Sequence, residues 1–174
     1  MYPTLRKILR VGIRTEPVPA PAGDDVVVER LQQDILRTLG RALALRHVDA
    51  GSCNACELEA QALSNPYYNL EGLGIRHVAS PRHADALMVT GPVSKHMAIA
   101  LRRTYDAMPE PKLVIAVGAC ACSGGIFGDS YATVGPLSKL LPVDVAIPGC
   151  PPSPTAMLQG ILAAITRAAR HVPR

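Results

Sequence analysis

The five cysteines of this chain fall in three short stretches. The second and third stretches directly follow runs that are typical of buried strands, residues 112–117 and 143–147, and the first follows the short run 47–50. The stretches contain, in order, Cys53 and Cys56, Cys120 and Cys122, and Cys150. In an open parallel sheet, ligands bind just beyond the carboxyl ends of the strands, so distant cysteines would meet at one edge. The pattern therefore predicts a metal centre at that edge.

Length and composition indicate one folded domain of the α/β class. The chain has 174 residues, which suits a single hydrophobic core, and 48% of them are apolar, as expected of a folded protein. Strand-like and helix-like runs alternate along the chain, which predicts a parallel sheet with helices on both faces. We expect this domain to cover residues 24–174.

Residues 1–23 are expected to form an arm and a linker in front of the domain. Residues 1–13 mix apolar and basic side chains, which fits a short amphipathic arm that docks on a partner or a membrane surface. A frayed terminus is the alternative. Residues 15–23 are rich in proline and predict an extended linker.

The rest of the sequence predicts the following order of elements. Helices are expected over about 26–45, 57–63, 94–108 and 134–141, and a last helix from a cap at 153 to about 169. Strands are expected over 75–78, 86–90, 112–117 and 143–147.

The composition argues against nucleic-acid binding, membrane spanning and disulfide chemistry. The formal net charge is +4, but Lys and Arg are scattered, and aromatic residues make up only 3% of the chain. Prolines interrupt the uncharged stretch 145–166, so we do not expect it to span a membrane. No apolar signal segment opens the sequence, and the cysteines therefore indicate a reducing compartment and metal chemistry.

The spacing of the cysteines favours an iron–sulfur cluster over zinc. Structural zinc sites usually bring paired ligands, whereas here one Cys-x-x-Cys pair is joined by Cys120 and Cys150 from distant segments. Helices beginning after Cys56 and after Cys150 would direct their positive ends at a cluster and compensate its charge. Cys122 competes with Cys120, since both lie in one glycine-rich turn. Cys120 is nearer the strand end, and we expect Cys122 to be a small buried thiol.

Four stretches of this sequence are also recognisable together. They are Gly51-Ser-Cys-Asn-Ala-Cys-Glu-Leu-Glu59, Ala79-Ser-Pro-Arg-His-Ala-Asp85, Gly118-Ala-Cys-Ala-Cys-Ser-Gly-Gly125 and Pro142-Val-Asp-Val-Ala-Ile-Pro-Gly-Cys-Pro-Pro152. On the strength of these stretches, the chain from about residue 5 to 162 resembles the small subunit that membrane-bound nickel–iron hydrogenases and respiratory complex I share. In complex I this subunit is called the 20 kDa or B-type subunit. Complex I members place two adjacent cysteines at the first motif. The form Cys53-Asn-Ala-Cys56 is similar instead to group 4 hydrogenases, including formate hydrogenlyase.

The resemblance implies that Cys53, Cys56, Cys120 and Cys150 hold one 4Fe–4S cluster in a flavodoxin-like α/β domain. It further implies an electron-transfer subunit next to the catalytic site of a complex that evolves or oxidises hydrogen and translocates ions. The expected partners are a large catalytic subunit, a ferredoxin-like iron–sulfur subunit and, through residues 1–14, membrane-arm subunits. The expected location is the inner face of the cytoplasmic membrane.

Two other functions fit the same sequence. An equivalent subunit of a complex I-like quinone oxidoreductase, or of a hydrogenase-like complex without nickel, would carry the same cluster beside a different large subunit. A zinc-stabilised structural protein would use the same cysteines for a single ion.

Two charged residues are candidates for roles around the cluster. Glu57 follows Cys56 directly, and it is either a carboxylate placed favourably at a helix amino terminus or a proton relay toward the large subunit. Arg82 matches the complex I pattern at Ser-Pro-Arg. It would either tune the cluster as a nearby cation or pair with Asp85 as a structural ion pair.

Overall fold

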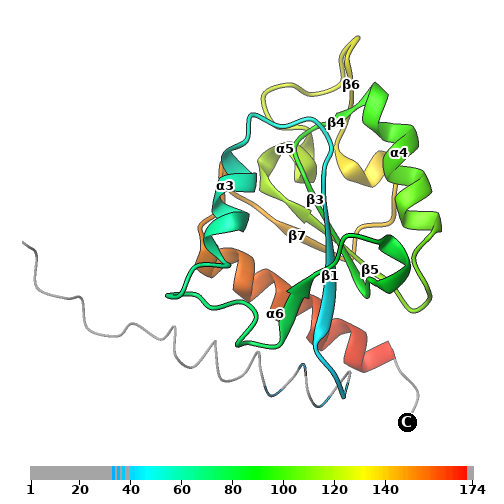
Figure 1. The fold of residues 1–174 in the computed structure, drawn as a ribbon. Helices are drawn as coiled ribbons and strands as arrows, with labels where there is room; N and C mark the ends of the chain where they lie inside the picture. The colour runs from blue at the N-terminus through cyan, green and yellow to red at the C-terminus, as the bar shows by residue number, and fades with distance from the viewer. Residues whose placement is uncertain (1–32, 34, 36, 38–39, 172–174) are drawn as a thin grey trace, which may run out of the picture.

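The computed structural model of this protein describes residues 33, 35, 37 and 40–171. The arm and linker expected over 1–23, and most of the helix expected over 26–45, lie outside the described residues. Within them, the structure is built around one five-stranded sheet and a separate two-stranded ribbon (Figure 1).

All neighbouring strands of the main sheet are parallel. Its strands are β1 (Leu43–Asp49), β2 (Ile75–His77), β3 (Ala86–Thr90), β5 (Leu113–Val117) and β7 (Val145–Ile147), in the spatial order β2-β1-β3-β5-β7. Counted along the chain, this is the strand order 2-1-3-4-5 of flavodoxin-like folds. The predicted fold class is therefore confirmed.

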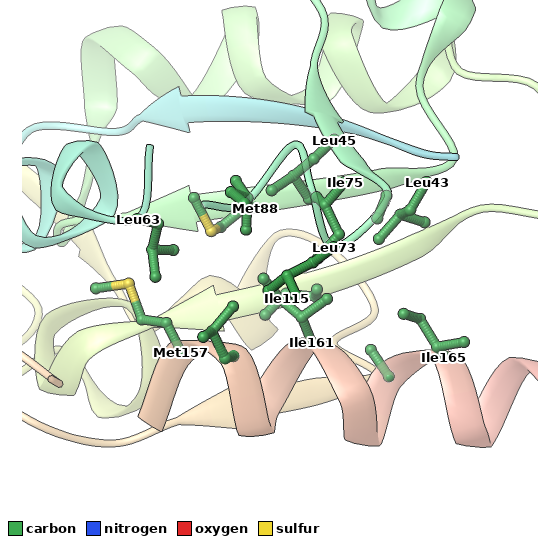
Figure 2. Close-up of a cluster of buried hydrophobic side chains, with 14 of the residues drawn as sticks. Leu43, Leu45, Leu63, Leu73, Ile75, Met88, Ile115, Met157, Ile161 and Ile165 are labelled. Carbon is green, nitrogen blue, oxygen red and sulfur yellow. The ribbon is translucent and has the colours of Figure 1, made fainter. Parts of the chain in front are cut away.

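Helices cover both faces of the sheet. On one face, α3 (Ala55–Ala62) and α6 (Pro154–His171) close a core of aliphatic side chains. Figure 2 shows Met157, Ile161 and Ile165 of α6 against Met88 and Ile115 of the sheet. On the other face, α4 (Lys95–Asp106), α5 (Gly118–Ser123) and the 3-10 helix η2 (Leu137–Lys139) close a second core. Strands with both faces covered form continuous apolar runs, which is why β3 and β5 were recognisable in the sequence.

The small ribbon lies at the carboxyl end of the main sheet. Strands β4 (Val93–Ser94) and β6 (Thr133–Gly135) pair antiparallel. Because Ser94 also accepts a hydrogen bond from the Met97 amide as the cap of α4, the ribbon is held to the start of that helix.

Three expected elements differ in the structure. The helix expected to reach residue 45 ends before it, since Gly40 has φ +63° and strand β1 already begins at Leu43. Residues 118–123 form the short helix α5, where the sequence indicated a glycine-rich turn. The helix expected over 134–141 is split between β6 and η2, because Pro136 has an extended backbone between them.

Candidate metal centre

The structure places the cysteine segments at the carboxyl edge of the sheet. Cys53 lies after β1 and Cys56 in the first turn of α3, Cys120 lies in α5 directly after β5, and Cys150 follows β7. These segments flank the switch point of the strand order, where β1 and β3 neighbour each other and chain connections leave in opposite directions. Figure 1 shows α3 and α5 at this end of the sheet.

Backbone contacts hold the three segments together. The Ala119 amide at the start of α5 donates a hydrogen bond of 2.7 Å to the carbonyl of Gly149, next to Cys150. A Cβ added to Gly118 would lie 2.6 Å from the Sγ of Cys56, and one added to Gly125 would lie 2.8 Å from the Sγ of Cys120. Both glycines have positive φ, so glycine suits the positions for conformation as well as for space.

The thiols influence one another electrostatically. Burial raises the pKa of Cys56 to about 11, and the negative charges of Glu57, Cys120, Cys53 and Cys150 contribute to this rise in that order. Burial also raises the pKa of Cys120, with Cys150 and Cys53 as the next causes. The thiolates of Cys53 and Cys150 are therefore close enough to Cys56 and Cys120 for their charges to raise the pKa of both. A group of thiols like this is stabilised when a cation replaces its protons.

The donor set and the glycine cradle fit a 4Fe–4S cluster. All five cysteines are free thiols. Among the described residues, no three His, Cys, Asp or Glu side chains converge so that they could hold one metal ion. A 4Fe–4S cluster takes its four thiolates from cysteines, one on each iron atom. Amides at the start of α3 and α6 direct positive dipole ends toward this edge, which favours a negatively charged group.

Cys122 belongs to the core rather than to this group. It is half-buried, packs against the core on the α4 side of the sheet, and its Sγ donates to the carbonyl oxygens of Ala116 and Ile147 at 3.5 Å. Burial is the largest cause of its raised pKa. This placement agrees with the expectation of a small buried thiol.

Glu57 points inward from α3. Its side chain is only 5% exposed, and neither carboxylate oxygen has a hydrogen-bond partner among the described residues. A buried carboxylate without a partner is costly, so its retention beside the cysteines calls for an explanation.

His47 lies within electrostatic reach of Glu57 and contacts Thr90, and sequence reasoning missed both His47 and Thr90. The Nε2 of His47 is 2.9 Å from the Oγ1 of Thr90, and the two residues lie on the neighbouring strands β1 and β3. Burial lowers the pKa of His47, and the negative charge of Glu57 partly offsets this. The available signal was the alternation of β1, in which His47 follows Leu43 and Leu45 on the face that α3 covers.

Arg82 lies at the opposite end of the sheet from the cysteines. It belongs to the 3-10 helix η1 (Pro81–His83), which precedes the amino end of β3, whereas the cysteines follow carboxyl ends. The alternative role of Arg82, an ion pair with Asp85, is also not found, because Asp85 pairs instead with Arg41 at 2.6 Å. The structure therefore does not bring Arg82 to the candidate centre.

None of the helices in the described part of the chain is long and apolar enough to cross a membrane.

Solved structures with the same fold belong to redox complexes. The chain superposes on a chain of a membrane-bound sulfane sulfur reductase, an archaeal respiratory complex, with a TM-score of 0.68 and 32% identity, covering 81% of this chain and 77% of that one. It superposes on a chain of an NAD⁺-reducing [NiFe]-hydrogenase with a TM-score of 0.59 at 17% identity, covering 76% of this chain and 96% of that one, a likeness of fold alone.

Relatives by sequence are subunits of oxidoreductase complexes. A probable membrane-bound hydrogenase subunit of Pyrococcus furiosus is 41% identical over 83% of this chain and 87% of its own length. Formate hydrogenlyase subunit 7 of Escherichia coli is 42% identical over 85% of this chain, which spans only 58% of that relative. An NADH-quinone oxidoreductase subunit of Geotalea daltonii is 43% identical over 83% of each chain. Residues 53–164 match the family described as NADH ubiquinone oxidoreductase, 20 Kd subunit, and the chain therefore belongs to that family.

Proposed function

We propose that this chain is an electron-transfer subunit that carries one 4Fe–4S cluster proximal to the catalytic site of a membrane-associated hydrogenase complex. The observation that carries the proposal is the gathering of Cys53, Cys56, Cys120 and Cys150 at the carboxyl edge of the sheet. Membership of a family whose relatives include hydrogenase subunits supports it.

The cysteines differ in exposure in a way that suits electron transfer to a partner. Cys56 and Cys120 are half-buried, whereas Cys53 and Cys150 are exposed. A bound 4Fe–4S cluster supplies a one-electron carrier whose potential depends on thiolate ligation, burial and amide hydrogen bonds. The protein would hold it from the sheet side with Cys56 and Cys120 and leave the other side for a large catalytic subunit to cover.

Glu57 is proposed as a proton relay of the complex. Its buried carboxylate has no partner among the described residues and lies one residue from Cys56. Hydrogen chemistry moves protons together with electrons, so a buried carboxylate beside the proposed cluster ligand Cys56 would have a proton-carrying role in the complex.

The surroundings of the chain are proposed from its relatives. They would include a large hydrogenase-like subunit, a ferredoxin-like iron–sulfur subunit and membrane-arm subunits, with this chain peripheral at the inner face of the cytoplasmic membrane. The hydrogenase subunit of Pyrococcus furiosus and the archaeal sulfane sulfur reductase are both described as membrane-bound, which supports a position at a membrane.

A second function within electron transfer is favoured by specific comparisons. The NADH-quinone oxidoreductase relative is 43% identical, and a sulfane sulfur reductase gives a TM-score of 0.68. The large subunit could accordingly reduce quinone or contain no nickel. The Cys53-Asn-Ala-Cys56 spacing favours the hydrogenase form. A zinc-stabilised structural role would use the same cysteines, and metal analysis distinguishes it from the cluster.

The test is anaerobic purification of the tagged chain with its complex, followed by metal analysis and low-temperature EPR of the reduced sample. We expect iron in cluster stoichiometry and a reduced-cluster signal that Cys150→Ser removes and Cys122→Ser, the matched control, retains. Nickel in the large subunit distinguishes a hydrogenase from a quinone reductase. Zinc without iron would overturn the proposal.

A further inference from the structure

The loop between α5 and β6 exposes large apolar side chains. Ile126 is 92% exposed, Tyr131 is 95% exposed and Phe127, the one phenylalanine of the chain, is 49% exposed. Figure 1 shows this segment, in yellow beside the β6 label, projecting at the carboxyl end of the sheet. We call residues 126–131 the apolar loop. Its exposed apolar surface is stabilised only if something covers it.

The conformation of the apolar loop is held by hydrogen bonds along its base. The Gly128 amide donates to the Gly124 carbonyl at 3.0 Å, and the Thr133 hydroxyl donates to the Gly128 carbonyl at 2.8 Å. The Ser130 amide donates to the Thr133 carbonyl at 3.2 Å, and Thr133 itself is buried. A loop that is already ordered loses little conformational entropy on binding, so its side chains can act as anchors.

The apolar loop borders the candidate centre. Gly125 precedes Ile126 directly, and a Cβ at Gly125 would lie 2.8 Å from the Sγ of Cys120. The loop therefore begins beside Cys120, one of the four candidate cluster ligands. A partner that covers the centre would reach the loop as well.

The charges of the loop select the chemistry of that partner. The segment 124–133 contains no Lys or Arg, and its one charged residue, Asp129, pairs with Lys139 of η2 at 2.7 Å. An anionic lipid surface is recognised through basic residues, which this loop lacks. An acidic or basic protein surface would likewise find no unpaired charge on the loop. What remains complementary is an uncharged, apolar recess on another protein.

We propose that the apolar loop is the principal anchor for the large catalytic subunit, and that Ile126 and Tyr131 insert into an apolar recess on that subunit. This inference rests on the proposed function, because the partner is the subunit that would cover the cluster. Interfaces concentrate their binding energy in a few such apolar and aromatic side chains, surrounded by contacts of little energetic weight.

The experiment compares variants in the complete complex, purified anaerobically through a tag on this chain. Ile126→Asp and, separately, Tyr131→Ala are the loop variants, and Ile99→Asp on the exposed face of α4 is the matched control, since Ile99 is 64% exposed. We expect the large subunit to dissociate about tenfold faster or more from each loop variant. The control should dissociate like the unchanged chain, and the iron content of all variants should be equal.

Four results would decide against the anchor. Dissociation from both loop variants at the unchanged rate would overturn it, and so would an equal effect of Ile99→Asp. Loop variants that retain the large subunit, yet no longer float with vesicles of anionic phospholipid, would assign the loop to the membrane. Loop variants that retain the large subunit, yet lose a dimer of this chain in light scattering, would assign it to self-association. Absence of iron from the unchanged complex would overturn the proposed function instead, independently of these rates.

Discussion

Gly118 lies directly against the thiol of Cys56. A Cβ added to this glycine would stand 2.6 Å from the Sγ, a separation that real Cβ atoms essentially never show. The contact joins the end of β5 to the first turn of α3, two segments far apart in the sequence. The absence of one methyl group at Gly118 therefore sets how closely the first and second cysteine segments approach.

Replacing Gly118 by Ala is expected to displace the Cys56 thiol and lower the iron content of the purified chain to less than about half. The matched control is Gly40→Ala, which also has a positive φ but has no atom within 4 Å of the added Cβ. Both variants strain the backbone by roughly 1–2 kcal/mol, but only the first crowds a thiol. Iron per chain, measured by colorimetric assay, should be unchanged in the control. Full iron in Gly118→Ala would show that the contact has no bearing on the centre.

Replacing Glu57 by Gln is expected to slow turnover of the complex about tenfold or more while leaving the reduced-cluster EPR signal intact. The amide keeps the shape of the buried side chain but cannot carry a proton between donors and acceptors. Glu59→Gln is the control, because Glu59 lies on the same helix and is less buried. Hydrogen-dependent dye reduction measures the rates. Equal rates in both variants would remove the relay and leave Glu57 with a structural role.

Removing the carboxylate of Asp85 is expected to destabilise the sheet by about 1–3 kcal/mol. Asp85 accepts a hydrogen bond of 2.9 Å from the Ala44 amide in β1 and pairs with Arg41. Asp85→Ala leaves a part-buried amide without its partner, whereas Arg41→Ala removes only an exposed ion-pair partner and should cost less than about 1 kcal/mol. Urea unfolding followed by circular dichroism gives both values. A larger loss of stability in Arg41→Ala than in Asp85→Ala would mean that the ion pair, and not the hydrogen bond from the Ala44 amide, is the stabilising contact.

Stability is expected to fall on acidification through the titration of His47. Burial holds its pKa below the ordinary value of 6.5, against a partial opposing effect of Glu57; His77, Asp49 and Arg46 also act on it. The unfolded chain therefore binds a proton at a pH at which the folded chain does not. The contribution of His47 to the free energy of unfolding is therefore fully present above about pH 6.5 and is lost as the pH falls toward its lower folded pKa.

His47→Gln should show a smaller loss of unfolding free energy between about pH 7.5 and 5.5 than the unchanged chain, measured by urea unfolding at both values. Some loss should remain, because the pKa of His77 is also lowered by burial. His96→Gln, an exposed position on α4, should lose as much as the unchanged chain. A loss in His47→Gln equal to that of the control would exclude His47 as the titrating group.

Much of the fold could be predicted because its determinants are local. The apolar runs of β3 and β5, the prolines that follow α4, and the serine before α6 act within a few residues of where they stand. The cysteine segments were equally recognisable, since a residue placed just after a parallel strand must lie at the carboxyl edge whatever the order of the strands.

Other features depended on contacts between distant segments. Strand β1 begins at Leu43 because β2 and β3 flank it, although the leucine spacing there also suits a helix. Arg82 was a candidate neighbour of the cysteines because of its motif, yet it stands at the amino end of β3. His47 could not be singled out until α3 covered it and placed Glu57 nearby.

Sequence alone specifies the alternation of strands and helices, the two-sided burial of the central strands and the positions of the thiols relative to strand ends. Three-dimensional packing was needed to establish which segments adjoin: Gly118 against Cys56, Glu57 near His47, and the apolar loop beside Cys120. The physical reason is the range of the interactions. Periodicity and turn chemistry act over a few residues, whereas strand order and side-chain packing join residues that the sequence separates by tens of positions.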